Sequence, residues 1–256
     1  MHQQQHKRLP PAVRAVSVAK DVDIALVTEL VSELLDTSVH WSLCDAAAHG
    51  FTYLVQTLSA QLPPNSDVDA VQDAMDAAAE HGHLQVVQWL HHNRSEGCTV
   101  DAMDLAAMNG HLDVVQWLHA HRAEGCTSEA MDLAAAAGHL RVVRWLHYHR
   151  HEGCSTDAMD VAASSGHLEV VKWLHMHRDE GCTHQALVNT SHNGHIHVVT
   201  WFVQFRREGD ILDAIEAAAQ RGNVVLVQWL LDHLHLRNDD SDLSVPRKRG
   251  HTSRRT

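Results

Sequence analysis

The chain has 256 residues, of which 45% are hydrophobic and 20% are charged, a balance typical of folded proteins. No run approaches the roughly 18 apolar residues of a membrane span, and the first twenty residues lack the apolar core of a secretory signal. Nine of the 20 Lys and Arg residues lie in residues 1–20 and 243–256, which contain no acid, so residues 21–242 contain 11 bases against 32 acids. Because so acidic a body repels phosphate backbones, it argues against nucleic acid as a ligand and favours basic protein partners.

Two segments precede the main part of the chain. Residues 1–20, which contain Gln, His and Pro, are predicted to form a loose tail. Residues 21–73 are predicted to hold a capping helix at 21–36 and a degenerate helical repeat that begins at Trp41. The Gly50 of this repeat lies 32 residues before Gly82, and we attribute the extra length to a loop at residues 63–66, Pro-Pro-Asn-Ser.

Residues 74–235, the repeat array, have a period of 28 residues. Six glycines and four cysteines keep this interval, and so do six tryptophans: Trp89, Trp117, Trp145, Trp173, Trp201 and Trp229. A fixed period of this length predicts an all-α solenoid in which each unit packs only on its neighbours.

Each repeat is predicted to contain two amphipathic helices. The first, such as 129–137, is rich in Ala and ends at a Gly that can adopt the left-handed conformation. The second, which starts at Leu140 in the same repeat, has an apolar stripe and is predicted to end at Gly153. The predicted N-caps of the first helices are Thr99, Thr127, Ser155 and Thr183.

Residues 236–256 are predicted to be a basic, disordered tail that follows a helix stop at Arg237. Its segment Pro246-Arg-Lys-Arg249 resembles a short nuclear-import signal. The once-per-repeat cysteines are too far apart to pair without strain, because packed helices lie about 8–10 Å apart, and free thiols indicate a reducing compartment. We therefore predict a monomer in the cytoplasm, with the nucleus as an alternative location.

The array resembles a known family. Met131-Asp-Leu-Ala-Ala-Ala-Ala-Gly-His-Leu-Arg-Val-Val-Arg-Trp-Leu is similar to the core of the ankyrin repeat. This resemblance implies an α-solenoid that binds proteins, without a cofactor or an enzymatic activity. The 28-residue period is shorter than the family's 33, so the β-hairpin fingers should be shortened or absent. Asp104 and Asp132 stand where the family has His, so the hydrogen bonds of that His cannot be carried over.

In the resembled fold the first helices line the concave surface, which is where we expect a partner protein to bind. One candidate set is a row of carboxylates that could meet a basic peptide: Asp76, Asp104, Asp132 and Asp160. The alternative for this row is a hydrogen-bond acceptor between units or a solvated stripe. The second set contains the positions that vary between units: Glu80, His81, Met108, Asn109, Ser164, Ser165, His192 and Asn193.

The 25 histidines suggest a different function, a metal-binding or pH-responsive module. Zinc requires four ligands, and no second ligand type accompanies the histidine rows, so we favour a role at the ends of the second helices. No phosphate-binding loop, nucleophile elbow or His-Glu-x-x-His motif is present. The polar segment Asn189–Asn193 replaces a Leu-Ala-Ala-type segment and marks either a binding locus or a drifting repeat.

Overall fold

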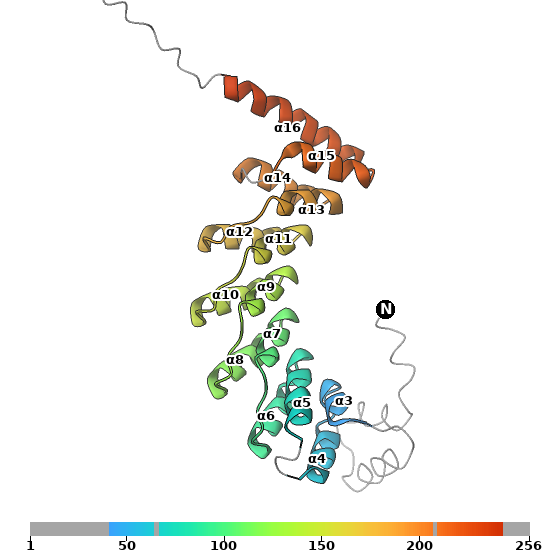
Figure 1. Ribbon diagram of the computed structural model, residues 1–256, viewed down its shortest axis with the longest axis vertical. Helices are drawn as coiled ribbons and strands as arrows, with labels where there is room; N and C mark the ends of the chain where they lie inside the picture. Colours follow the sequence, from blue (N-terminus) through green and yellow to red (C-terminus); the bar gives the residue numbers. More distant parts are fainter. Residues whose placement is uncertain (1–40, 64–66, 207–208, 243–256) are drawn as a thin grey trace, which may run out of the picture.

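The computed structural model describes residues 41–63, 67–206 and 209–242, which form fourteen helices and no strand (Figure 1). The predicted tail at 1–20, the predicted helix at 21–36 and the basic segment after residue 242 lie outside these residues.

The helices form seven consecutive pairs. The first helices of the pairs are α3 (Leu43–Ala48), α5 (Val68–Glu80), α7 (Asp101–Met108), α9 (Glu129–Ala136), α11 (Asp157–Ser164), α13 (Gln185–Asn193) and α15 (Ile211–Gln220). The second helices are α4 (Thr52–Gln61), α6 (Leu84–Asn93), α8 (Leu112–His121), α10 (Leu140–His149), α12 (Leu168–His177), α14 (Ile196–Phe205) and α16 (Val224–Asp242).

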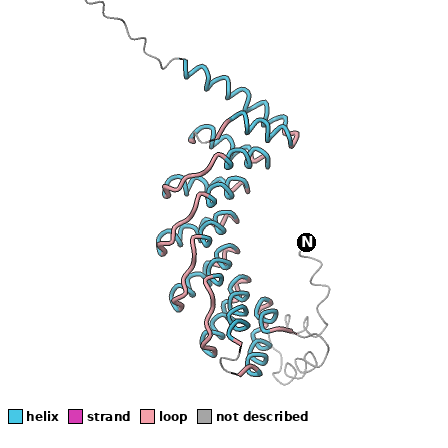
Figure 2. The backbone as a smooth tube through the Cα atoms, viewed as in Figure 1, coloured by secondary structure: helices cyan, strands magenta, loops and turns pink. Residues whose placement is uncertain are grey.

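The pairs stack into a curved rod, as Figure 2 shows, with the first helices along its concave side and the second helices along its convex side. This arrangement confirms the predicted all-α solenoid. Loops connect the described pairs where fingers would project, and they contain no strand.

Small side chains form the interior of the inner layer. In α9, Ala130, Ala134 and Ala135 are fully buried, which lets adjacent first helices approach closely. In α10 the buried residues are Val142, Val143 and Leu146, so the apolar stripe predicted from the sequence faces the first helices and the next repeat. One unit cannot bury both faces by itself, and stacking supplies the missing partner.

Two helix ends differ from the prediction. Helix α10 ends at His149 and not at Gly153, because Arg150 is extended (φ −125°, ψ 159°) and Gly153 lies in the following loop at φ +77°. Helix α16 continues to Asp242, past the stop predicted at Arg237.

Five of the turns inside pairs, at Gly50, Gly82, Gly110, Gly138 and Gly166, pack against a histidine of the next repeat. Gly110 has φ +79°, and a Cβ added there would lie 2.7 Å from the His139 ring. The equivalent His83 also makes a polar contact with the preceding repeat, because its Nε2 lies 3.0 Å from the carbonyl oxygen of Ala48. The Gly-His pairs therefore join consecutive repeats, and they require glycine for both its backbone and its lack of a side chain.

On the second helices, histidine, tryptophan and arginine interlock between repeats. Trp117 stacks on His121 of its own helix at 4.5 Å and meets the edge of His91 from the previous repeat at 5.1 Å. Arg122 forms an ion pair with Glu124 and reaches back to His91, with Nη1 3.3 Å from Nδ1. The same arrangement recurs in the following repeats, which explains the regular spacing of these residues.

A candidate protein-interaction surface

The concave side of each first helix presents one row of accessible positions. In α7 these are Asp101, Leu105, Met108 and Asn109, at spacings i, i+4, i+7 and i+8, which place them on one helix face. Asp101 and Asn109 are exposed, whereas Leu105 and Met108 are partly buried. This face is thus acidic at its start, apolar in the middle and polar at its end.

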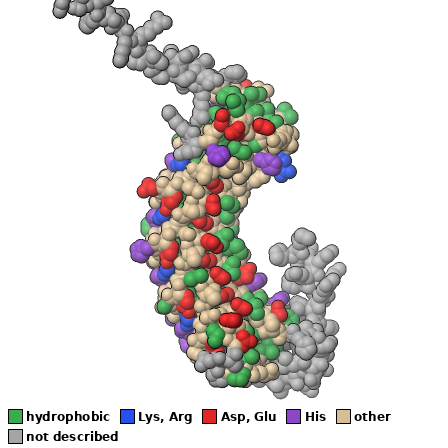
Figure 3. Space-filling model, viewed as in Figure 1, with side chains coloured by type: hydrophobic (Ala, Val, Ile, Leu, Met, Phe, Trp, Pro, Cys, Tyr) green, Lys and Arg blue, Asp and Glu red, His purple; other side chains and the backbone are tan. Residues whose placement is uncertain are grey.

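Stacking aligns these positions in rows along the array. The exposed acidic row consists of Asp73 in the second turn of α5 and of first-turn acids in later first helices, Asp101, Glu129, Asp157 and Asp213, and Gln185 of α13 interrupts it. One turn later lies the apolar row of Leu105, Leu133 and Val161, of which Val161 is 41% exposed. Figure 3 shows acidic side chains along the first helices, with hydrophobic side chains beside them at the concave edge.

The carboxylate row predicted as a contact surface lies elsewhere. Asp76, Asp104 and Asp160 are only 8%, 4% and 8% exposed. Asp104 accepts hydrogen bonds from the backbone N–H of Thr127 at 3.0 Å and from its hydroxyl at 2.6 Å. The partly buried Asp132 accepts the N–H of Ser155 at 2.9 Å in the same way. The geometry therefore matches the alternative of an inter-unit acceptor, and a partner cannot reach these carboxylates without displacing the next repeat.

Thr127 connects Asp104 with the start of the next first helix. Its hydroxyl donates to Asp104 and accepts the N–H of Glu129, the first residue of α9, at 3.1 Å. The N-cap in the structure is Ser128, so Thr127, the predicted N-cap, lies one residue before the actual one. Burial raises the pKa of the Asp104 carboxyl, and the hydrogen bonds from Thr127 lower it in part. We call each such pair an Asp–Thr bridge; the described junctions contain Asp76–Thr99, Asp104–Thr127, Asp132–Ser155 and Asp160–Thr183.

The variable positions lie at the far end of the same concave face. The exposed members are His81, Asn109, Ser165 and Asn193, and the partly buried members are Glu80, Met108, Ser164 and His192. Some also bond within the array, since the Nδ2 of Asn193 donates to the Ser164 carbonyl at 2.7 Å. The structure thus places these eight residues beside the exposed acidic and apolar rows.

The exposed acidic row was not predicted from the sequence as a binding surface. Asp101, Glu129 and Asp157 lie in the first turn, where acids interact favourably with the helix dipole, and the sequence was interpreted in those terms alone. The signal was available in the sequence, because these acids precede Leu105, Leu133 and Val161 by four residues each.

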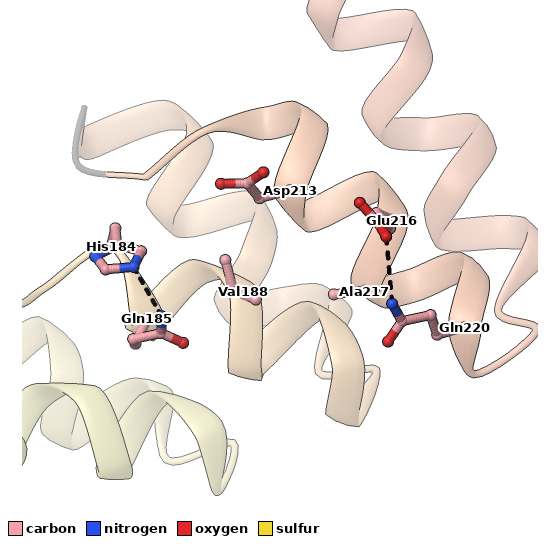
Figure 4. Close-up of a pocket in the computed structure, with 7 residues that line it drawn as sticks. All are labelled: His184, Gln185, Val188, Asp213, Glu216, Ala217 and Gln220. Atoms are coloured by element: carbon pink, nitrogen blue, oxygen red, sulfur yellow. Dashed lines mark hydrogen bonds between the residues drawn. The ribbon is translucent and has the colours of Figure 1, made fainter.

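The last inter-repeat junction breaks the pattern. Val188 and Ile211 replace the Asp and Thr of the bridge, and Ile211 is 3% exposed. Between α13 and α15 an open pocket of about 280 Å³ is lined by His184, Gln185, Val188, Asp213, Glu216, Ala217 and Gln220 (Figure 4). The polar replacements in α13 do not form this pocket, since Thr190 and Ser191 are fully buried. Thr190 donates to the carbonyl of Ala186 in its own helix.

The cysteines and histidines offer no comparable site. Burial raises the pKa of the Cys98 thiol to about 12 and of Cys126 and Cys154 to about 11, which keeps these thiols protonated and unreactive. Within the described parts of the chain, no three His, Cys, Asp or Glu residues are grouped so that they could hold a metal ion. No helix there is long and apolar enough to cross a membrane.

Comparison with known families agrees with this geometry. Residues 75–119 match a family model of ankyrin repeats in many copies, and residues 103–186 match a model of three ankyrin repeats. This part of the chain is an ankyrin-repeat array. Ankyrin repeats are protein–protein interaction modules, and proteins built from them are typically non-enzymatic. No curated protein matches the chain.

These repeats also depart from the ankyrin family in the contacts between first helices. Asp104 and Asp132 stand where the family has His, and Asp–Thr bridges link consecutive repeats. Because the bridges bury Asp76, Asp104 and Asp160 and partly bury Asp132, the exposed rows are the positions open to a partner.

Proposed function

We propose that the chain is a scaffold or adaptor whose concave face binds a basic, amphipathic segment of a partner protein. The observation that carries this proposal is the exposed acidic row beside the apolar row on consecutive first helices. Aliphatic parts of the partner would cover Leu105, Leu133 and Val161, while its Lys or Arg side chains meet Asp101, Glu129 and Asp157.

The repeat spacing defines which segments fit. Adjacent first helices lie roughly 8–10 Å apart, as packed helices do, so the acids of the row recur at about that interval. A polyproline II segment advances about 3.1 Å per residue with three residues per turn, so a base at every third position would lie on one face at this interval. A helix advances about 1.5 Å per residue and would need bases about one heptad apart. The variable residues Glu80 and His81, with their counterparts in later repeats, would then select among such segments.

A charge-reversal experiment tests this proposal. Asp101, Glu129 and Asp157 are replaced together by Lys in the full chain, and proteins retained by it are compared with those retained by the unmodified chain. The matched control carries Lys at Asp113, Glu169 and Asp179, three exposed acids outside the first helices, so that both variants change the net charge equally. Circular dichroism confirms that each variant is folded.

The expected result is that a basic partner binds the control and the unmodified chain and is lost from the first-helix variant. Its affinity for the unmodified chain should fall as salt rises, because exposed charges are screened beyond about 10 Å at 0.1 M. Equal loss in both variants would show that net charge alone drives capture, and unchanged capture by the first-helix variant would remove the concave face from the proposal. A cytoplasmic or nuclear location and a monomeric state remain predictions from the sequence.

A further inference from the structure

The pocket between α13 and α15 combines an apolar floor with an acidic rim. Val188 and Ala217 supply the floor, and Asp213 and Glu216 lie on the α15 side (Figure 4). At four other junctions, from α5–α7 to α11–α13, an Asp–Thr bridge lies between the first helices. Loss of the bridge at Val188 and Ile211 thus coincides with an opening that can take a side chain.

The dimensions and chemistry of this pocket suit a long cationic side chain. Lys and Arg lay their aliphatic stems on apolar surface and keep the charged group in a polar environment. In this pocket the stem would cover Val188 and Ala217, and the charge would lie beside Asp213 and Glu216. Glu216 is exposed, and the Gln220 Nε2 donates a long hydrogen bond of 3.5 Å to its carboxylate.

The chain itself supplies such cations. Residues 243–256 contain Arg247, Lys248, Arg249, Arg254 and Arg255 and no acid, whereas residues 21–242 are strongly acidic. We propose that this basic segment occupies the α13–α15 pocket of its own chain. Like the proposed concave-face function, this contact would pair basic side chains with the acidic row, but it needs no external partner.

The covalent connection is long enough for this contact. Helix α16 packs on α15 after the turn at 221–223, and residue 231 follows this turn by as many residues as Asp213 precedes it. From there to Asp242 the helix extends roughly 16 Å at 1.5 Å per residue. An extended chain spans at most about 3.3–3.6 Å per residue, so Arg247 and Lys248 come into range, and Arg254 reaches well beyond. A short tether of this kind gives the segment an effective concentration of the order of millimolar.

Occupation of the pocket by this segment would regulate the concave face. Asp213 belongs to the exposed acidic row, so a basic partner and the basic segment would compete for the same end of the surface. Modification that neutralises the segment, or a partner of higher affinity, would release it.

Zero-length carbodiimide crosslinking of the full chain tests the proposal, because it joins a lysine only to a carboxylate in direct contact. Lys248 is the only lysine after Lys172, so its crosslinked peptides can be assigned by mass spectrometry. The ion pair of Lys172 with Glu169 at 2.9 Å supplies an internal positive control. We expect Lys248 to couple to Asp213 or Glu216, with a yield that is independent of protein concentration.

The matched variant keeps Lys248 and replaces Arg247, Arg249, Arg254 and Arg255 by Gln. Its Lys248 crosslink should fall roughly tenfold, as expected from the loss of several weak surface charge pairs, while the Lys172 control is unchanged. Three outcomes overturn the proposal: Lys248 couples mainly to other acids, its yield rises with protein concentration as for a second copy, or the Gln variant crosslinks as well as the unmodified chain. None of these outcomes bears on the concave-face proposal, since no partner is present.

Discussion

Replacement of Asp104 by Ala tests whether the Asp–Thr bridges hold consecutive repeats together. Asp104 is 4% exposed and accepts two hydrogen bonds from Thr127, one from the backbone at 3.0 Å and one from the hydroxyl at 2.6 Å. Hydrogen bonds to a charged group contribute about 1.5–3 kcal/mol each. The burial that raises the pKa of Asp104 offsets part of this gain. We therefore expect Asp104→Ala to lower the free energy of unfolding by about 2–4 kcal/mol.

The matched control is Asp101→Ala, which removes an acid of the same charge from the same helix. Asp101 is exposed and lies in the first turn, where a helix-dipole interaction contributes about 0.3–1 kcal/mol. Urea unfolding followed by circular dichroism measures both variants, and amide exchange shows whether protection is lost in α7 and α9. If Asp104→Ala destabilised the chain no more than Asp101→Ala, the bridge would not be a significant contact between repeats.

Replacing both Asp104 and Thr127 distinguishes the contribution of their hydrogen bond from the contribution of side-chain packing at the junction. The chain itself carries Val188 and Ile211 at the last junction, at the positions of Asp104 and Thr127. Replacing both partners of a buried hydrogen bond by apolar groups is often nearly neutral, whereas removing one leaves a donor or acceptor unsatisfied. Asp104→Val combined with Thr127→Ile should thus be more stable than either single variant. A cost equal to the sum of the single variants would show that the two residues are not coupled.

Two further predictions concern the Gly-His contacts. Gly110→Ala should destabilise the array by about 1–3 kcal/mol more than Gly222→Ala in thermal or urea unfolding, because both have positive φ but only Gly110 faces the ring of a following His; equal costs would assign the effect to the backbone alone. Burial lowers the pKa of His83, His111 and His167, so the unfolded chain binds more protons and stability should fall as the pH drops through about 6.5. A variant with Asn at all three positions, as the chain has at Asn223, should lose less melting temperature between pH 7.5 and 5.5, and an equal loss in both proteins would contradict this assignment. Burial also raises the pKa of Asp76, Asp104 and Asp132, so here the folded chain binds more protons than the unfolded chain. This effect increases stability as the pH falls through the range where carboxylates titrate.

The sequence predicted the fold because its strongest signals are local and repeated. The 28-residue interval of Trp89, Trp117 and the later tryptophans defines the unit, and the Ala-rich and Val-Val-containing segments define its two helices. The 28-residue period, shorter than the family's 33, correctly predicted loops without fingers, as the described residues confirm. Helix ends were less predictable, because a loop such as Arg150–Gly153 is held by the ion pair of Arg150 with Glu152 and by the contact of Arg150 with His119 of the previous repeat.

The candidate surface was less predictable, because exposure depends on contacts between repeats. Asp101 and Asp104 lie three residues apart on one helix, and the sequence alone does not show which of them the next repeat covers. The missing information was the partner of Asp104: Thr127 lies 23 residues later, and its predicted N-cap role concealed its contact with the preceding repeat.

The pocket lies at the α13–α15 junction, which has no Asp–Thr bridge. In a bridge, an Asp of one first helix is hydrogen-bonded to a Thr just before the next first helix, so a polar group lies between the two helices. Val188 and Ile211 keep their junction packed by apolar contact alone, without a polar group that must be satisfied at a fixed distance. Space between α13 and α15 can then open towards Asp213 and Glu216 without leaving a buried carboxylate unpaired. In an array of near-identical units, a specific binding site needs such a departure, and here it coincides with the acidic end of the concave face.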